Sequence, residues 1–443
     1  MHLTAFIALR FSNTIVMTPL VDRKHEGMPV EPTSTQYLVK AKMKTEVRIP
    51  SESLKLGMYV SKLDRPWTEV PVLLQGFSLI SQSDIDILQA HCQYVYIETD
   101  DPQWIEYKEE LSTRKFKAFE EKKSIHEEIP EARATLQKTH VHVEKVLNDV
   151  NNGETFDLEE SRQAVRQCVD SIARNANAML WLSMIKNEDQ YTSEHCMRVG
   201  ILAIAFGRFM GMSEQDQELL GLCGLLHDVG KIKIPNEILN KPGRLTQEEY
   251  RVMREHVSLG EMVLGEIDGL DPLIIQTALH HHERADQKGY PDNLDASLLH
   301  QFIRMVAIVD VYDAITSNRC YQEGRTPFEA LRILFNEAEK HFDKDLVEVF
   351  IKMIGIYPPG TLIEMANGEL GIVISSNPLS RLKPKVELVT DRHKKLRPPY
   401  VIDMSKNPTD SNGTAYVIER GLANGAYGID IKDYLFRDSD LSA

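Results

Sequence analysis

Histidine and aspartate residues gather in one part of the chain in a way that suits metal chemistry. Six of the fifteen histidines lie between positions 195 and 282. They are His195, His227, His256, His280, His281 and His282. Imidazole nitrogen combined with carboxylate oxygen, as in the dipeptide His227-Asp228, suits Fe, Mn, Ni or Zn, and no cysteine pair has the spacing of a structural zinc site. The sequence therefore predicts metal-centred chemistry.

The spacing of these residues suggests two ions. Adjacent residues on a helix project about 100° apart, so His227 and Asp228, or His281 and His282, cannot easily serve one metal from one face. Asp228 could bridge two ions while Asp310, in an apolar segment, reaches in from another helix. Two ions about 3.5–4 Å apart can share a water, lower its pKa and aim the hydroxide at phosphorus. This arrangement predicts hydrolysis of a phosphate ester.

Taken singly, each residue also has a structural explanation. His195 alone could be a hydrogen-bonded packing residue, and Asp310 could be a buried salt-bridge partner. Residues 280–282 could be a surface run of histidines. Only the joint arrangement in one helical segment favours the metal site.

The elements that must position these residues are helices. Residues 158–356 carry apolar side chains at helical spacing, interrupted by proline and glycine, and are predicted to form an all-helical catalytic domain. The fold class expected is mainly α, with a small N-terminal α+β domain and a short β-rich C-terminal appendage. The other segments expected are an unstructured or wrongly assigned start (1–42), the small α+β domain (43–100), a charged helical linker (101–157) and the β-rich appendage and tail (357–443).

Short patterns support the two outer domains. Strands are predicted at 54–60, 72–74, 77–80 and 94–97, with a helix from Ser83 to about His91. Near the C-terminus, segments 361–365 and 371–375 flank Asn367-Gly368, which is a hairpin signal, and 386–389 could add a strand.

Composition excludes several classes of protein. The chain has 51 Lys+Arg against 66 Asp+Glu, a net charge of −15, which argues against binding a long nucleic acid. Residues 181–370 alone carry a net charge of −12. No apolar run is long enough to span a bilayer, and the segment 3–21 is read as neither anchor nor signal. Five scattered cysteines favour a reduced, cytoplasmic protein.

Four stretches of the sequence resemble the HD-GYP family, a subgroup of the HD phosphohydrolases. They are HDVGK at 227–231, the isolated His256, HHERADQKGYP at 281–291 and DVYDAITSNR at 310–319. The resemblance covers about residues 180–355, and the GYP block at its spacing after the HD dipeptide is the specific part. Residues 43–145 resemble, more weakly, the small domain that precedes some bacterial HD-GYP domains.

The resemblance implies a metal-dependent phosphodiesterase that opens a cyclic dinucleotide second messenger to a linear dinucleotide through a metal-bridging hydroxide. One metal would be held by His195, His227, Asp228 and Asp310, and the other by Asp228, His256, His281 and His282. The cofactors expected are two divalent ions, Fe²⁺ or Mn²⁺ first, with Ni²⁺ or others as alternatives. Catalytic roles are implied for Asp228 and Lys231, and substrate contacts for Asp189, Arg319 and Tyr290.

Three departures from the family pattern bear on the metal number and the substrate. Tyr191 replaces a glutamate that in some members supports a third metal, which favours two metals. Gln287 follows Asp286 where glycine is usual, and Gln322 replaces a basic residue; both are named as candidate substrate contacts. We hypothesise that they shift the preference towards 3′,3′-cyclic GMP-AMP, with cyclic di-GMP still accepted.

Two alternative functions stay open at this level. The chain could be a non-catalytic effector that binds a cyclic dinucleotide, or a different HD enzyme acting on nucleotides. The partner expected is the cyclic dinucleotide itself, with no nucleic-acid polymer and no membrane insertion. A homodimer through residues 158–187 and a signalling protein partner are further possibilities that the sequence leaves open.

Overall fold

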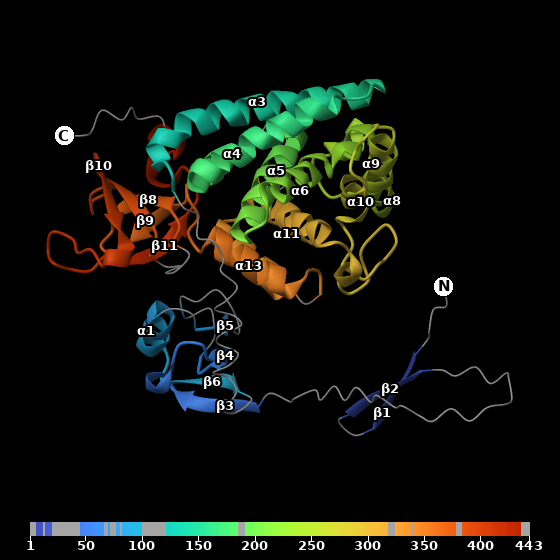
Figure 1. The fold of residues 1–443 in the computed structure, drawn as a ribbon. Coiled ribbons are helices and arrows are strands. Elements are labelled where there is room, and N and C mark those ends of the chain that lie inside the picture. The colour runs from blue at the N-terminus through green and yellow to red at the C-terminus, as the bar shows by residue number, and fades with distance from the viewer. Residues whose placement is uncertain are drawn as a thin grey trace. The chain divides into compact units, whose positions relative to one another are not determined.

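The structure, a computed structural model, describes residues 6–11, 14–19, 45–65, 70, 77–79, 82–99, 121–184, 191–317, 324–338, 340–377 and 383–435. The chain divides into two compact units, Met1–Thr113 and Arg114–Ala443, shown in Figure 1. The architecture is mainly helical, with strands at both ends of the chain, as the sequence predicted. Each unit is described by itself.

The first unit contains a hairpin and a small sheet with one helix. The hairpin joins β1 (Phe6–Phe11) to β2 (Thr14–Pro19). The antiparallel sheet has the order β3-β6-β4-β5, formed by β3 (Thr45–Pro50), β6 (Tyr94–Thr99), β4 (Tyr59–Leu63) and β5 (Phe77–Ser78). Helix α1 (Gln82–His91) precedes β6, and a 3₁₀ turn, η1 (Ser51–Ser53), follows β3. This is the α+β character expected of residues 43–100.

Two local expectations differ from this unit. Residues 6–11 and 14–19 pair as antiparallel strands although residues 1–42 were expected to be unstructured or wrongly assigned; both strands are rich in apolar and β-branched residues, which favour strand pairing. The strand expected at 54–60 begins later, at Tyr59, because Gly57 adopts a left-handed conformation (φ 90°) that turns the chain first. The strand expected at 72–74 lies outside the described residues.

The second unit is built mainly on helices (Figure 1). The longer helices are α3 (Ile125–Asn152), α4 (Leu158–Ser183), α5 (Tyr191–Phe209), α6 (Glu214–Leu226), α11 (Gln301–Thr316) and α13 (Lys344–Ile354). The shorter ones are η3 (Val229–Lys233), α7 (Asn236–Leu239), α8 (Gln247–Arg254), α9 (His256–Gly265), α10 (Pro272–His280), η4 (Ala296–Leu298) and α12 (Pro327–Asn336).

Helix α3 lies within the segment expected to be a charged linker, yet one face of it is apolar and packs against the bundle. A capping box between Ser124 and Glu127 starts the helix, and Gly153 in a left-handed conformation ends it. Residues such as Val143 and Val146 are buried, and Glu128, fully buried, pairs with Arg174 of α4. Charged residues alternate with the apolar ones along this segment, so the apolar face was not recognised from the sequence. The domain limits given above stay predictions.

The chain after α13 forms an antiparallel five-stranded sheet of order β10-β9-β8-β7-β11. Its strands are β7 (Leu362–Met365), β8 (Leu370–Ser375), β9 (Lys385–Thr390), β10 (Leu396–Asp403) and β11 (Ile418–Leu422), followed by η6 (Ala426–Gly428) and α14 (Lys432–Leu435); η5 (Met404–Lys406) follows β10. The predicted hairpin is present as β7 and β8. Strands β10 and β11 were not predicted, because prolines and charges interrupt their patterns.

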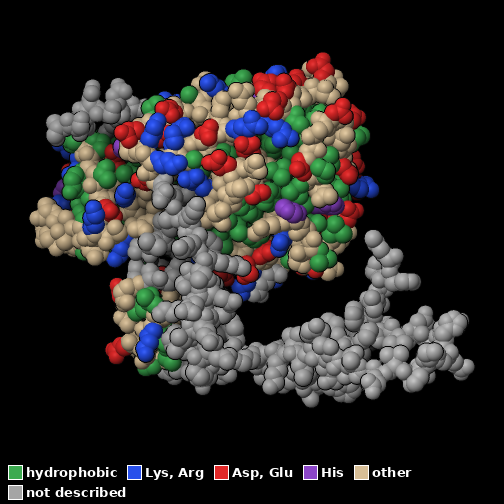
Figure 2. Space-filling model, in the orientation of Figure 1, with side chains coloured by type: hydrophobic (Ala, Val, Ile, Leu, Met, Phe, Trp, Pro, Cys, Tyr) green, Lys and Arg blue, Asp and Glu red, His purple; other side chains and the backbone are tan. Residues whose placement is uncertain are grey.

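Burial separates the core of the second unit from its charged surface. Large side chains such as Trp181, Phe206 and Phe350 are fully buried among the helices. On the face drawn in Figure 2, acidic and basic side chains are interspersed and histidines show at few points. No helix within the described ranges is both long and apolar enough to cross a membrane.

Candidate metal centre and active site

The seven predicted metal ligands converge from five places in the helical unit. His195 lies one turn inside α5, and Asp310 lies on α11. His227 ends α6 and Asp228 starts η3, so the dipeptide occupies a helix junction rather than a continuous helix. The others are His256, which begins α9, and His281 and His282, which follow α10.

These side chains form two groups that share Asp228. Cluster A consists of His195, His227, Asp228 and Asp310, and cluster B consists of Asp228, His256, His281 and His282. In each cluster the candidate ligand atoms lie within 4.8 Å of one another. All seven side chains except the partly exposed His282 are buried. The clusters contain the same residues as the two metal sites expected from the sequence, and metal binding by them stays a prediction.

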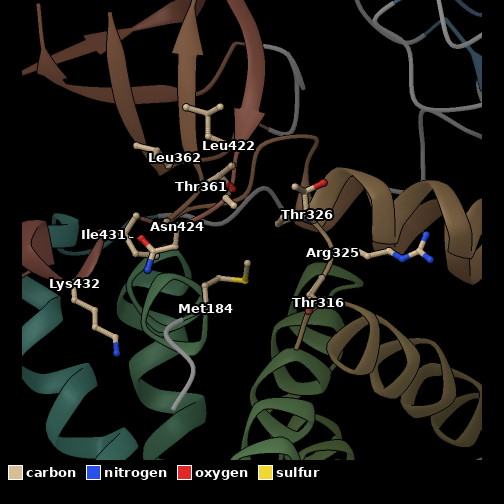
Figure 3. Close-up of a pocket in the computed structure, with 14 residues that line it drawn as sticks. Met184, Thr316, Arg325, Thr326, Thr361, Leu362, Leu422, Asn424, Ile431 and Lys432 are labelled. Carbon is tan, nitrogen blue, oxygen red and sulfur yellow. Dashed lines mark hydrogen bonds between the residues drawn. The ribbon is translucent and has the colours of Figure 1, made fainter. Parts of the chain in front are cut away.

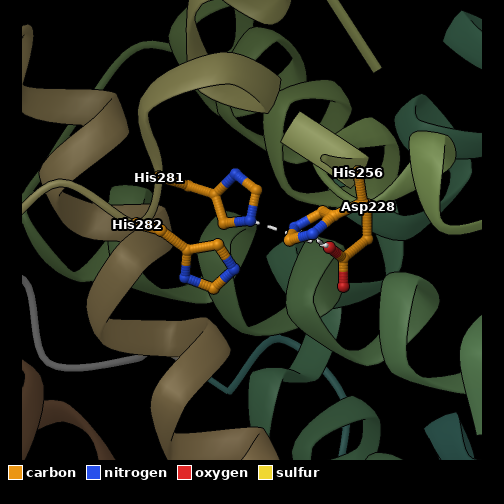
Figure 4. Close-up of side chains that lie close together, drawn as sticks. All are labelled: Asp228, His256, His281 and His282. Atoms are coloured by element: carbon orange, nitrogen blue, oxygen red, sulfur yellow. Dashed lines mark ion pairs between the residues drawn. The ribbon is translucent and has the colours of Figure 1, made fainter. Parts of the chain in front are cut away.

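Asp228 directs one carboxylate oxygen to each cluster. Its Oδ2 lies 3.4 Å from His195 Nε2 and 3.2 Å from His227 Nε2. Its Oδ1 lies 3.3 Å from His256 Nε2 and 3.6 Å from His281 Nε2. Figure 4 shows His256 and His281 directed towards Asp228, with His282 beside His281. A carboxylate in this position has the geometry of a bridge.

The histidine tautomers leave Nε2 without a proton. The Nδ1–H groups of His227 and His256 donate to the carbonyl oxygens of Gly224 and Met253, both at 2.7 Å. His281 Nδ1 donates to the carbonyls of Thr277 and Ala278 at 3.0 Å. A carbonyl can only accept, so each of these rings, in its neutral form, presents an Nε2 lone pair to Asp228.

Buried atoms without partners show that a cation fits here. The Nε2 atoms of His227, His256 and His281 and the Oδ1 atom of Asp228 are buried and have no hydrogen-bond partner. Lone pairs of imidazole facing carboxylate oxygens at these distances repel one another unless positive charge lies between them. The donor set of nitrogen and oxygen suits a divalent transition metal.

Burial and neighbouring charges shift the pKa values of most cluster residues in the direction that favours the protonation states required for metal binding. Burial alone would raise the pKa of Asp228, but the positive charges of His227 and Lys231 hold it well below its usual range. Burial would also raise the pKa of Asp310, but the neighbouring imidazoles of His195 and His227 hold it well below its usual range. Burial lowers the pKa of His281 to about 4 and that of His282 well below its ordinary value. Ionised carboxylates and neutral imidazoles are the ligand forms.

His227 departs from this pattern. Burial would lower its pKa, but the nearby carboxylates of Asp228 and Asp310 raise it above the ordinary value. In cluster A the two carboxylates therefore stabilise the protonated form of His227 in the metal-free protein.

A buried ion network orients His195 in cluster A. Its Nδ1 donates to Asp313 Oδ2 at 2.7 Å. Arg198 donates to both oxygens of Asp313, at 2.7 and 3.0 Å, and to Glu194 at 3.0 Å. Arg198 Nη2 also donates to Ser317 Oγ at 3.2 Å. Asp313 thus fixes the ring of His195 from the side opposite to the metal position.

Gly230 allows η3 to approach α9, which brings His256 next to Asp228. A Cβ atom at position 230 would lie 2.0 Å from the carbonyl oxygen of His256 and 2.4 Å from the backbone nitrogen of Gly260. Neither backbone atom can move away without shifting α9. The glycine of the HDVGK stretch is therefore required by packing rather than by a turn.

The loop after His282 folds back over cluster B. A Cβ on Gly289 would lie within 2.6 Å of backbone atoms of residues 282–284. Tyr290 consequently stacks on His282, with ring centroids 4.7 Å apart and an angle of 29° between the rings. The guanidinium of Arg254 lies 4.3 Å from the ring centroid of Tyr290. Tyr290 is held between a cation and a candidate ligand.

Lys231 lies next to the shared carboxylate. Its ammonium group pairs with Asp228 Oδ2, and the side chain as a whole is 19% exposed. The lysine therefore connects the buried clusters with the solvent side of the site, where an anionic substrate would arrive.

The remaining candidate substrate contacts are placed as follows. Asp189, Arg319 and Gln322 lie outside the described residues, as does the side chain of Tyr191. Gln287 is exposed, and its backbone has φ 57°, in the left-handed region where glycine is common. Among the described residues no hydrogen bond joins its side chain to either cluster. The expectation that it places an amide near the pocket gains no support.

Sequence reasoning did not identify the residues that hold the ligands. Asp313 lies three residues after Asp310, and Arg198 three after His195, so each shares a helix face with a ligand. That spacing was a usable signal. Arg254, two residues before His256, carried no such signal.

Comparison with known proteins identifies the family of the chain. The HD domain family matches residues 180–346, and a domain of unknown function, DUF3391, matches residues 46–161. A cyclic di-GMP phosphodiesterase of Pseudomonas aeruginosa is 34% identical over 371 residues, which is 81% of this chain and 89% of that protein. The chain belongs to the HD-GYP family.

Other HD-GYP proteins match smaller shares of the chain. The cyclic di-GMP phosphodiesterase response regulator of Xanthomonas campestris is 36% identical over 169 residues, 38% of this chain and 45% of that protein. A 3′3′-cGAMP-specific phosphodiesterase of Vibrio cholerae is 31% identical over 176 residues, 40% of this chain and 41% of that protein. An HDG“Y”P protein of Bdellovibrio bacteriovorus has a TM-score of 0.44 at 19% identity, covering 69% of this chain and 98% of that chain.

Proposed function

We propose that this HD-GYP protein hydrolyses one phosphodiester bond of a cyclic dinucleotide and releases a linear dinucleotide. The observation that carries the proposal is the pair of clusters that share Asp228, with unpartnered Nε2 and Oδ1 atoms between them. The similarity to cyclic di-GMP and 3′3′-cGAMP phosphodiesterases supports the substrate class.

Two divalent ions, Fe²⁺ or Mn²⁺ in the first place, are the proposed cofactors. Cluster A would hold one and cluster B the other, with Asp228 contributing one oxygen to each. Bound there, two ions supply Lewis acidity and lower the pKa of a water that serves as the nucleophile. The seven proposed ligands are all imidazole or carboxylate groups. None is a thiolate, so the site lacks the soft ligands that prefer soft metal ions.

The chain's own residues orient and neutralise the reacting groups. The carbonyl partners of His227, His256 and His281 fix their rings, so that little reorganisation is needed when substrate binds. Lys231 offers an ammonium group beside Asp228, where it can donate to a phosphoryl oxygen or to the leaving oxygen. Tyr290 shields His282 from solvent on one side.

The hypothesis of a shift towards 3′,3′-cyclic GMP-AMP rests on Gln287 and Gln322. Gln287 makes no described contact with the clusters and so gives this hypothesis no support. Asp189 and Arg319 remain proposed substrate contacts on the family motif alone. The ratio of kcat/KM for the two substrates measures the preference.

Replacement of Asp228 tests the proposal. In Asp228→Ala we expect metal content to fall at both clusters and kcat/KM to drop by on the order of 10³-fold, because the shared oxygen ligands are lost. Metal analysis of anaerobically purified protein and product identification measure the two effects. Asp345→Ala, at an exposed position on α13, is the control.

Two outcomes would contradict the proposal. If Asp228→Ala kept its full metal content, Asp228 would not bridge the two metal positions. If the fully metal-loaded wild type bound the cyclic dinucleotide but did not hydrolyse it, the protein would be a binding protein rather than an enzyme.

A further inference from the structure

One basic side chain next to the clusters has no acidic partner among the described residues. Within that part of the chain, four arginines or lysines lie no more than three positions from a cluster residue. Three of them are neutralised by carboxylates: Arg198 by Asp313 and Glu194, Lys231 by Asp228, and Arg284 by Asp286. The fourth, Arg254, forms no ion pair with any described residue.

Arg254 is held by an aromatic ring instead of a carboxylate. Its guanidinium carbon lies 4.3 Å from the ring centroid of Tyr290, and Tyr290 stacks on His282 with centroids 4.7 Å apart. The contact with the ring uses the charge of the guanidinium, and none of its five N–H donors has an acceptor among the described residues. Arg254 is partly exposed, so an anion from solvent can reach these donors.

The position of Arg254 also has a purely structural explanation. It is the last residue of α8, where the helix dipole favours a positive charge. Arg251 lies in the same turn, is exposed, and serves the dipole equally well. Of these two arginines only Arg254 contacts Tyr290, so a comparison between them separates a role at the site from support of the helix.

The geometry separates Arg254 from the position of the reaction. The ring of Tyr290 lies between the guanidinium and His282, so Arg254 does not contact the candidate metal ligands. A phosphodiester held at the clusters would meet Lys231 instead, beside Asp228. A cyclic dinucleotide carries two anionic phosphodiesters on opposite sides of one ring. When one of them lies at the clusters, the other lies away from them and needs a cation of its own.

The largest cavity described in the helical unit does not supply that cation. It has a volume of about 420 Å³ and lies where the C-terminal sheet meets the ends of α4 and α11. Figure 3 shows that the side chains of its two described basic residues, Arg325 and Lys432, point away from the space beside Met184. Arg254 is therefore the better placed of these three cations.

We propose that Arg254 binds the phosphodiester that is not cleaved and so holds the cyclic dinucleotide across the site. The inference rests on the proposed function, because it requires a substrate with two phosphates. The planar guanidinium would donate to two oxygens of that phosphate, while the scissile phosphate lies at the clusters beside Lys231. Arg254 then contributes to binding and not to bond cleavage, so its loss raises KM and leaves kcat nearly unchanged.

Arg254→Gln and Arg251→Gln, compared in the full-length, metal-loaded protein, test the inference. With the better of the two cyclic dinucleotides as substrate, we expect Arg254→Gln to raise KM at least about tenfold and to change kcat by less than about threefold. Arg251→Gln should stay within about twofold of the wild type in both constants. Arg254→Lys keeps the charge but loses the planar donor pair, so its KM should be intermediate. Equal KM values in Arg254→Gln and Arg251→Gln would overturn the proposal.

A substrate with a single phosphate separates substrate binding from support of the metals. Bis(p-nitrophenyl) phosphate has one diester and no second anion, so Arg254→Gln should hydrolyse it as the wild type does. A parallel loss with this substrate, or a loss of bound metal, would show that Arg254 acts through Tyr290 and His282. Either result would refute the contact with the second phosphate.

The same measurements distinguish failure of the inference from failure of the proposed function. If the wild type cleaved bis(p-nitrophenyl) phosphate but neither bound nor cleaved a cyclic dinucleotide, the proposed function would be wrong and the inference with it. If the wild type bound the cyclic dinucleotide without cleaving it, calorimetry on the two variants would decide. Binding at least about tenfold weaker in Arg254→Gln alone would support the inference, and equal binding in both variants would reject it.

Discussion

Cluster A and cluster B share Asp228, but their histidines are held by different parts of the protein. In cluster B, carbonyl oxygens at helix ends orient His256 and His281. In cluster A, the carbonyl oxygen of Gly224 orients His227 in the same way, but the side chain of Asp313 orients His195, and Arg198 in turn fixes Asp313. Cluster B therefore depends on helix ends and backbone packing, and cluster A depends on a buried ion network as well. The two halves should therefore fail under different substitutions.

The largest effect should come from breaking the ion network of cluster A. Asp313→Ala leaves Arg198 buried with only part of its partners, and we expect a loss of about 3–5 kcal/mol in the free energy of unfolding. Urea unfolding measures this loss. Metal bound to cluster A should fall while metal bound to cluster B stays, since the carbonyl partners of cluster B are untouched.

An exposed acid provides the control for this substitution. Asp345→Ala, on α13, should change stability by no more than about 0.5–1 kcal/mol. If Asp313→Ala were equally mild, or if it released metal from both clusters alike, the division between the two halves would be wrong.

The close contact between Gly230 and α9 offers the corresponding test on cluster B. Gly230→Ala pushes a methyl group into the carbonyl of His256, so α9 must shift and cluster B should lose metal first. We expect a destabilisation of about 1–3 kcal/mol, measured by urea unfolding together with metal analysis.

The matched control lies on the helix that Gly230 contacts. Gly265 ends α9, and a Cβ at that position would have no other atom within 4 Å, so Gly265→Ala should be neutral or stabilising by up to about 1 kcal/mol. A destabilised Gly265→Ala with a stable Gly230→Ala would show that close approach does not position His256.

These tests also show what the sequence could and could not reveal. The residues of clusters A and B could be predicted to lie together because their types and spacing are unusual. The partners of His195 were not identified, although Asp313 and Arg198 each stand three residues after a candidate ligand, because nothing in the sequence says that α5 and α11 face one another. Strand β10 was hidden by Pro398 and Pro399, and the apolar face of α3 by its charges.

A smaller effect should follow from removing the ring that covers His282. Tyr290→Leu loses the stack and the contact with Arg254, and we expect metal affinity at cluster B to fall about tenfold. Tyr290→Phe keeps the ring and should bind metal nearly as the wild type does. Competition with a chelator measures both. Equal losses in the two variants would assign the effect to the hydroxyl instead.

The smallest effect concerns the protonation of the metal-free protein, where His281 of cluster B and His227 of cluster A should respond to acid with opposite signs. The pKa of His281 is lowered to about 4, so the folded state loses stability as the pH falls from about 6.5 towards 4, because the unfolded chain takes up the proton first. The pKa of His227 is raised, so its contribution is present at acidic pH and is lost as the pH rises through its folded-state pKa.

Nuclear magnetic resonance of the metal-free protein can follow both rings. The His281 ring should stay unprotonated at pH 5.5, about a unit below the ordinary histidine pKa, while His227 is protonated there. A short histidine-containing peptide in the same buffer provides the reference titration. Identical titration of His281 and His227 would contradict the asymmetry between the clusters.

The position of Asp228 at the junction of α6 and η3 has an evolutionary consequence. A single base change can turn an aspartate codon into an asparagine codon, and here that one event would weaken both metal positions at once while leaving the volume of the side chain almost unchanged. Catalysis could therefore be lost in one step without loss of the fold. In homologues that keep the pocket but have lost the reaction, the first inactivating substitution is expected at this residue.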